Sequence, residues 1–206
     1  MRRADPDLQR RRIEEIVAAA TACFLDKGFH KTGVQDIAER AGLTHPTLLY
    51  HFKSKERLYA AVIEQAMLDW AAMTSRAVSA APVGFERVAA LVAAGMEFFA
   101  THHDFVIIWR REAIEGGGRL EHAMAEHMRP FLVRAVAFLE REIAAGRLRR
   151  HDPEELMQLV YGAVSTYFSD AGFRARLSGI DPMTPESRAR FADTLTAMLR
   201  DALAPR

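Results

Sequence analysis

The sequence AGLTHPTLLYHFKSKERLYAAV, residues 41–62, combines helix-breaking and helix-forming residues within a short distance. It sets Gly42 and Pro46 among apolar residues at helical spacing, and so predicts two short helices joined by a tight turn. Thr44 can cap the second helix, and Pro46 suits its first turn because the N–H that proline lacks would have no helical partner there. Hydroxyl, imidazole and ammonium groups crowd on this bend, which indicates a binding surface.

The remainder of the chain also predicts helices. The first apolar positions recur every three or four residues, and Gly28 follows them as a stop signal. Thr32 with Gln35 can cap the next helix, and Gly33 with Asp36 is the other candidate cap. No stretch alternates at period two long enough to predict a strand, so the fold class is all-α. The nine expected helices cover residues 9–27, 34–41, 45–51, 55–80, 84–101, 104–114, 119–145, 153–175 and 185–203.

Composition limits the class of protein. Half of the 206 residues are apolar, which suffices for one or two globular domains. The single cysteine, Cys23, cannot form an intramolecular disulfide and lies on an apolar helix face, so we expect a buried core residue in a reducing compartment. The opening residues lack the apolar run of a signal peptide, and no run approaches the roughly 20 apolar residues of a membrane span. We therefore expect a cytoplasmic protein.

Charge is unevenly distributed, although the formal net charge is only +1. Residues 1–60 hold 11 Lys and Arg against 8 Asp and Glu, which leaves the remainder slightly negative. The asymmetry is modest and does not by itself identify a nucleic-acid-binding surface. Residues 1–60 are therefore the more basic part of the chain.

Two short helices that meet at Gly42, with a longer helix after them, form a helix-turn-helix arrangement. Its second helix can lie in the major groove of DNA. Leu43, Leu48 and Phe52 would then pack inward. The residues left outside, several with hydroxyl or imidazole groups that suit phosphate oxygens, are Thr44, His45, Pro46, Thr47, Tyr50 and His51. The alternative is that the bend serves packing alone and that some of these side chains are partly buried spacers.

The longer run GVQDIAERAGLTHPTLLYHFKSKERLYAAV, residues 33–62, resembles the DNA-binding region of the tetracycline-repressor (TetR) family of bacterial transcription regulators. The I-A-x-x-A-G turn, the T-L-x-x-H-F-K-S-K run and the E-x-L-Y that follows occur in the family's order. The likeness covers residues 10–62, and the rest fits by length and helical character. It implies an N-terminal three-helix DNA-binding domain over residues 1–54, followed by a C-terminal helical ligand-binding and dimerisation domain over residues 55–206.

The resemblance implies that the recognition helix begins with residues that approach base edges and continues with phosphate contacts. The base-edge positions are Thr44, His45, Pro46 and Thr47, and the phosphate positions are Tyr50 and His51. Leu49 stands where the family often has a phosphate-contacting tyrosine, so we transfer that role to Tyr50.

Three residues outside the recognition helix match DNA contacts of the family. Lys55 matches a residue that meets a phosphate through its ammonium group at a helix N-terminus. Thr32 stands where the family anchors the DNA backbone at the second helix. Gly33 stands where Ser or Thr is frequent, so it keeps a backbone N–H but no hydroxyl.

The second half of the chain holds more apolar helix than a DNA-binding head needs. Most of it is expected to be core, but polar side chains among the apolar ones can orient a small apolar or amphipathic effector in a cavity. The candidate pocket residues are Phe99, His103, Trp109, Arg110, His127, Phe131 and Tyr161. The alternative is a DNA-binding scaffold that takes no ligand.

The sequence predicts no metal site, no cofactor and no enzyme. His102 and His103 are neighbours that a helix points about 100° apart, and His122 with Glu126 supplies only two ligands. The chain lacks a G-x-S-x-G elbow, a phosphate loop, C-x-x-C, H-E-x-x-H and paired Glu-x-x-His motifs.

Two late helices predict a homodimer interface. Residues 153–175 and 185–203 each carry an apolar face, and two such helices from each of two chains would form a four-helix interface. Its two-fold symmetry suits a palindromic operator in double-stranded DNA. The alternative is that both helices cover their own chain's core. The face residues are Leu156, Leu159, Val160, Ala163, Val164 and Tyr167 on the first helix and Phe191, Leu195, Met198 and Leu199 on the second.

Taken together, the DNA-binding region, the candidate pocket and the dimer interface lead us to expect a ligand-responsive regulator, most simply a repressor that its effector releases from DNA.

Overall fold

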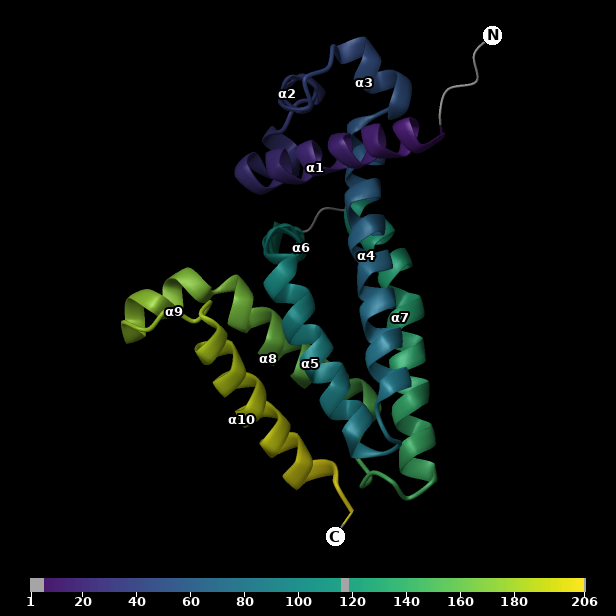
Figure 1. The fold of residues 1–206 in the computed structure, drawn as a ribbon, viewed down its shortest axis with the longest axis vertical. Coiled ribbons are helices and arrows are strands. Elements are labelled where there is room, and N and C mark those ends of the chain that lie inside the picture. Colours follow the sequence, from purple (N-terminus) through teal and green to yellow (C-terminus); the bar gives the residue numbers. More distant parts are fainter. Residues whose placement is uncertain (1–5, 116–118, 206) are drawn as a thin grey trace. The chain divides into compact units, whose positions relative to one another are not determined.

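The computed structural model describes residues 6–115 and 119–205, which form ten helices and contain no strand (Figure 1). The predicted all-α class is confirmed. No single helix in these ranges is both long and apolar enough to cross a bilayer, and Phe85–Thr101 with His103–Arg111 meets that test only as a bent pair. The helices are α1 (Pro6–Lys31), α2 (Val34–Arg40), α3 (His45–His51), α4 (Lys55–Ala80), α5 (Phe85–Thr101), α6 (His103–Glu115), α7 (Arg119–Ala144), α8 (Pro153–Ser169), α9 (Ala171–Ser178) and α10 (Pro185–Leu203).

The tenth helix comes from a break at Asp170, so the prediction of one helix over residues 153–175 is wrong. Asp170 has φ −102° and ψ 13°, and the Ser169 hydroxyl donates to its carboxylate over 2.8 Å. Serine and aspartate side chains offer local hydrogen bonds that compete with helical ones. The apolar spacing continues across this point, which is why the sequence pattern conceals the break.

The chain forms two compact units, Met1–Ala66 with Ile107–Ala125 and Met67–Val106 with Glu126–Arg206. By these bounds α4, α6 and α7 each pass from one unit into the other. A domain boundary after residue 54 stays a prediction, since α4 continues without interruption through the residues that follow.

The first unit contains the helix-turn-helix and an aromatic core. The Phe24 ring lies 5.8 Å from that of Phe29 and 5.1 Å from that of Tyr59, centroid to centroid. Ile37 on α2 and Leu48 on α3 are fully buried, and each such burial contributes roughly 1.5–3 kcal/mol. Cys23 is buried as predicted, and burial raises the pKa of its thiol.

In the second unit α5 packs against both α8 and α10 (Figure 1). The predicted interface faces of α8 and α10 lie mostly in this core: Val164, Tyr167 and Leu199 are buried, and Leu156, Val160, Phe191 and Leu195 pack against them and their neighbours. Leu159 and Met198 are 70% and 67% exposed. The alternative that these helices cover their own chain therefore holds for most of the residues named.

A buried ion pair joins the start of α5 to the turn after α7. The Glu142 side chain, 4% exposed, accepts hydrogen bonds from Arg147 Nε (2.7 Å), Arg147 Nη2 (2.8 Å) and the Gly84 backbone N–H (2.9 Å). Arg147, with help from Gly84, lowers the pKa of the Glu142 carboxyl below its usual 4.5. A lowered pKa means that this contribution to folding is present above the unfolded-state pKa and is lost as the pH falls through the folded-state value.

Replacing this carboxylate tests that contribution. Glu142→Gln should lower the free energy of unfolding at pH 7 by about 2 kcal/mol, because charged hydrogen bonds to a buried acceptor are lost. Urea unfolding at several pH values should show the difference from the wild type shrinking as the pH falls below 4.5. Glu140→Gln, at an exposed site on the same helix, is the control and should change little. A difference that stays constant into acid would contradict a charged role for Glu142.

Candidate nucleic-acid interface

α3 presents a polar outer face above one buried anchor. Leu48 is fully buried, His51 is half-buried, and the exposed residues are Thr44, His45, Pro46, Thr47 and Tyr50. Thr44 caps the helix as predicted: its Oγ1 accepts from the Thr47 backbone N–H (3.3 Å) and lies 2.7 Å from Thr47 Oγ1. The cap therefore also fixes the Thr47 hydroxyl at the start of the recognition helix.

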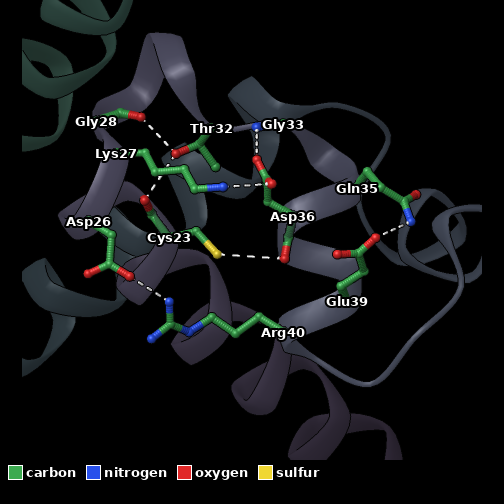
Figure 2. Close-up of polar contacts among 10 residues, drawn as sticks. All are labelled: Cys23, Asp26, Lys27, Gly28, Thr32, Gly33, Gln35, Asp36, Glu39 and Arg40. Atoms are coloured by element: carbon green, nitrogen blue, oxygen red, sulfur yellow. Dashed lines mark hydrogen bonds and ion pairs between the residues drawn. The ribbon is translucent and has the colours of Figure 1, made fainter.

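Polar contacts hold α2 against the end of α1 (Figure 2). Of the two candidate caps, the structure uses Gly33 with Asp36, whose Oδ2 accepts from the Gly33 N–H over 2.7 Å. Lys27 donates to the other oxygen of Asp36 (2.7 Å), and Arg40 donates to Asp26 (2.7 Å). The Lys27 contact, and then that of Gly33, lower the pKa of Asp36. These contacts fix the helix that precedes the turn.

Thr32 does not reach the surface. Its side chain is 1% exposed, and its hydroxyl lies 2.7 Å from the Gly28 carbonyl oxygen and 3.0 Å from that of Cys23 (Figure 2). Its N–H donates to the same Gly28 carbonyl, and the Gly33 N–H is taken by Asp36. The DNA-backbone anchor predicted for Thr32 therefore does not fit this structure, because the residue satisfies carbonyls at the end of α1. The Gly33 N–H is likewise engaged.

Lys55 joins the start of α4 to the end of α1. Its Nζ donates to the Phe29 carbonyl (2.9 Å) and lies 4.3 Å from the centroid of the Phe29 ring. Ser54 caps the helix by accepting from the Arg57 N–H (3.3 Å). An ammonium group has three donors, so Lys55 keeps capacity for a phosphate.

Two cations beside α3 were missed by sequence reasoning. Lys27 and Arg40 on the α1–α2 side pair with carboxylates, whereas Lys53 and Arg57 have no acidic partner among the side chains that the structure describes. Lys53 Nζ lies 5.9 Å from the Tyr50 ring centroid. Cations without acidic partners attract phosphates. Their signal in the sequence was the K-S-K-E-R run directly after the recognition helix.

None of the predicted ligand residues lines either of the two hollows found among the described residues. Phe99 belongs to the core, with its ring 5.4 Å from that of Phe98 and 6.0 Å from that of Phe168. His103 Nε2 lies 3.3 Å from the Phe168 carbonyl oxygen. These two residues therefore pack against α8, and the prediction that they line a cavity is not supported.

Four of the other five predicted ligand residues have side chains that the structure describes. Phe131 is half-buried with the Arg134 guanidinium 4.6 Å from its ring centroid, and Tyr161 is half-buried on α8. Trp109 and Arg110 belong to the first compact unit. The side chain of His127 lies outside the described residues.

Two hollows in the described part of the chain are lined by other residues. The larger, about 490 Å³, runs along α4 and α5 between alanines and Met73, with Arg76 and Glu97 among its lining. The smaller, about 350 Å³, lies beside α1 and Gln65. The sequence analysis selected aromatic and polar residues for a pocket and did not include the alanines that line the larger hollow.

Comparison with known families accounts for both parts of the chain. Residues 16–62 match the family described as bacterial regulatory proteins, tetR family, and residues 85–199 match the tetracyclin repressor-like C-terminal domain. The chain belongs to the TetR family. Its relatives in the TetR family are transcriptional regulators, not enzymes. This confirms the expectation of a TetR-type regulator and the expectation that the chain is not an enzyme.

Individual relatives agree with this family. The HTH-type transcriptional regulator RutR of Escherichia coli K12 is 26% identical over 90% of this chain and 85% of its own length. The HTH-type transcriptional repressor KstR2 of Mycobacterium tuberculosis H37Rv is 34% identical over 48% of this chain and 50% of its own. The structure of the regulator FadR of Bacillus subtilis in complex with stearoyl-CoA covers 89% of this chain and 97% of its own, with a TM-score of 0.74 and 18% identity. At that identity the likeness shows the TetR fold alone.

Lys55 should behave as one phosphate contact. We expect Lys55→Met to weaken binding to every DNA sequence and to reduce the slope of log K against log salt by about 1. Fluorescence anisotropy titrations at four salt concentrations measure both quantities. Lys27→Met, which removes a cation already paired with Asp36, is the control and should leave the slope unchanged. An unchanged slope for Lys55→Met would remove this residue from the interface.

His45 should read a base. We expect His45→Asn to change the preferred base pair at one operator position by about 1–3 kcal/mol, because imidazole and amide groups match different base edges. Selection from random DNA followed by sequencing reports the preference. His30→Asn alters an exposed histidine on α1 and should return the wild-type site. The same site from both variants would refute the reading role of His45.

Proposed function

We propose that this TetR-family regulator is a homodimeric repressor that binds a palindromic operator through α3 and is released by a small apolar or amphipathic molecule. The observation that carries the proposal is the outer face of α3, where hydroxyl and imidazole groups stand exposed above the buried Leu48. We assign residues 1–54 to DNA binding and residues 55–206 to effector binding and dimerisation. Binding to the chromosome places the protein in the cytoplasm.

The interface residues that we assign to DNA are those that remain exposed or keep a spare donor. Thr44, His45, Pro46 and Thr47 lie at the start of the recognition helix, Tyr50 and His51 at its end, and Lys55 begins α4. Lys53 and Arg57 add two cations without acidic partners among the described side chains. A short helix with polar ends and flanking cations suits a groove lined by phosphates.

The effector is expected to act by shifting the equilibrium between two conformations of the protein. A molecule that binds more tightly to the conformation with wrongly spaced recognition helices depletes the DNA-competent state by its difference in affinity. α4 is suited to carry the change, because it begins at Lys55 in one unit and continues into the other. Support for an effector comes from the family, where FadR of Bacillus subtilis was solved with stearoyl-CoA. That molecule is amphipathic, as the expected effector is.

A gel-shift titration tests the function. The purified protein should bind DNA from upstream of its own coding sequence specifically, and the binding should weaken with salt, as phosphate contacts require. Stearoyl-CoA and shorter acyl-CoAs are the first probes for release. No specific site in that DNA, and none in a random-sequence selection, would contradict the proposal. Specific binding that no acyl-CoA releases would exclude this effector class.

The dimer can be tested at residues that do not support the fold. Deleting α10 would remove Leu199 and Leu203 from the core, so single exposed residues are the better probes. We expect Leu159→Glu and Met198→Glu to yield monomers in sedimentation equilibrium, because paired carboxylates would be buried at a two-fold interface. Leu177→Glu on α9, at a site 72% exposed, is the matched control and should remain dimeric. Monomers from Leu177→Glu alone would move the interface to α9.

A further inference from the structure

Two threonine hydroxyls meet at the start of the recognition helix. Thr44 Oγ1 and Thr47 Oγ1 lie 2.7 Å apart, and both residues are exposed. The separation is that of an O–H···O hydrogen bond, and either oxygen can be its donor. A hydroxyl carries one proton and two lone pairs. The two threonines therefore hold two hydroxyl protons, and one of these is used between them.

The backbone of α3 keeps this pair in place. Thr44 Oγ1 also accepts from the Thr47 N–H (3.3 Å), and the Leu48 N–H donates to the Thr44 carbonyl (3.0 Å). Pro46 has no N–H, and that of Thr47 is already bonded to the cap. The first turn of α3 therefore offers few backbone donors to a partner, and its polar chemistry is mainly that of its side chains.

The shared proton allows two arrangements of the pair. When Thr47 donates, both lone pairs of the Thr44 hydroxyl are occupied, so Thr44 can only donate outward and Thr47 can only accept. When Thr44 donates, Thr47 keeps the free proton, and each oxygen keeps one lone pair. In both arrangements the pair has a single proton left for a partner, whereas two independent threonines would have two.

Base edges in the major groove differ in the same property. Adenine presents an amino group where guanine presents a keto oxygen, and cytosine presents an amino group where thymine presents a keto oxygen. A keto oxygen needs a proton from the protein, whereas an amino group supplies one. One free proton can satisfy one keto oxygen, and a second keto oxygen would be buried at the interface without a donor.

We propose that Thr44 and Thr47 read two base positions of the operator as one coupled unit, which accepts a keto oxygen at either position but not at both. The coupled readout rests on the proposed function, because the start of α3 must face the base edges. A threonine that acts alone can contact an amino or a keto group equally. Without the shared proton, the preferences at the two positions would be independent.

Selection from random DNA locates the two positions. Thr47→Val keeps the shape of the side chain without its hydroxyl, and Thr44→Gly removes the other hydroxyl at a small cost to the cap. Each variant is expected to lose the base preference at one position that the wild type specifies. A variant that returns the wild-type site unchanged would remove its hydroxyl from the readout and overturn the proposal.

Four duplexes then measure the coupling. They carry an amino or a keto group at each of the two positions, by exchange of adenine with guanine or of cytosine with thymine. Fluorescence anisotropy titrations give their dissociation constants. For the wild type, we expect the duplex with two keto groups to bind at least fivefold more weakly than the product of the two single exchanges predicts, because one keto oxygen is left without a donor.

Thr44→Asn separates the coupling from the cap. Asparagine caps a helix at least as well as threonine, and its carbonyl oxygen can accept from both the N–H and the hydroxyl of Thr47 while its amide group donates separately. The Thr47 proton is then always used, so the effects of the two exchanges should multiply. Thr47→Ser keeps both hydroxyls and should retain the coupling. Thr101→Val removes an exposed hydroxyl at the end of α5 and should match the wild type.

The outcomes distinguish the coupled readout from the function on which it rests. Effects that multiply in the wild type, or a coupling that persists in Thr44→Asn, would overturn the shared proton while leaving DNA binding intact. A wild-type chain that selects no site from random DNA would overturn the proposed function and the coupled readout with it. Thermal melts show whether each variant is folded at the assay temperature, and Thr44→Asn locates the first position if Thr44→Gly is not.

Discussion

The carbonyl groups at the end of α1 impose the constraint on which the DNA-binding head depends. Gly28 ends the regular helix, and a buried carbonyl left without a donor costs about 1–3 kcal/mol. The donors come from three separate parts of the chain: Thr32 in the next turn, Lys55 at the start of α4 and Arg111 on α6. Because none of them is supplied by α1 itself, the end of this helix is complete only when the turn before α2, the start of α4 and α6 are in place. The head is thus assembled as one cooperative piece.

This arrangement explains how a seven-residue recognition helix can be ordered. A helix of that length is unstable by itself in water, so its order must come from tertiary packing and capping. Leu48 supplies the buried anchor and Thr44 the cap. The recognition helix is then stabilised by the core on its inner side and by its N-terminal cap. Its outer face therefore does not need to pack against the protein. Residues such as His45 and Tyr50 are therefore exposed without loss to the fold.

The sequence predicted what local chemistry controls and missed what long-range packing controls. The expected bounds of α3, α4 and α10 agree with the structure, and for α3 the Thr44 cap acts within one helical turn. Thr32 was misassigned because its hydroxyl is claimed by carbonyls that only the folded turn presents. Apolar spacing on α8 showed that a face is buried but not what covers it, and Val164 lies in the chain's own core. The pocket residues stay a prediction, and aromatic spacing alone does not separate them from core residues such as Phe99, which packs in the core.

Effector control in a protein of this kind needs only a modest coupling energy, typically 1–3 kcal/mol between two sites. The helices α4 and α6 each have residues in both compact units. Each also donates a hydrogen bond to a carbonyl near the end of α1: Lys55 of α4 to that of Phe29, and Arg111 of α6 to that of Leu25. Loss of one such charged hydrogen bond changes the free energy by about 1.5–3 kcal/mol, which is the size of the coupling required. The polar contacts that complete α1 are thus individually as large in free energy as the coupling that such control requires.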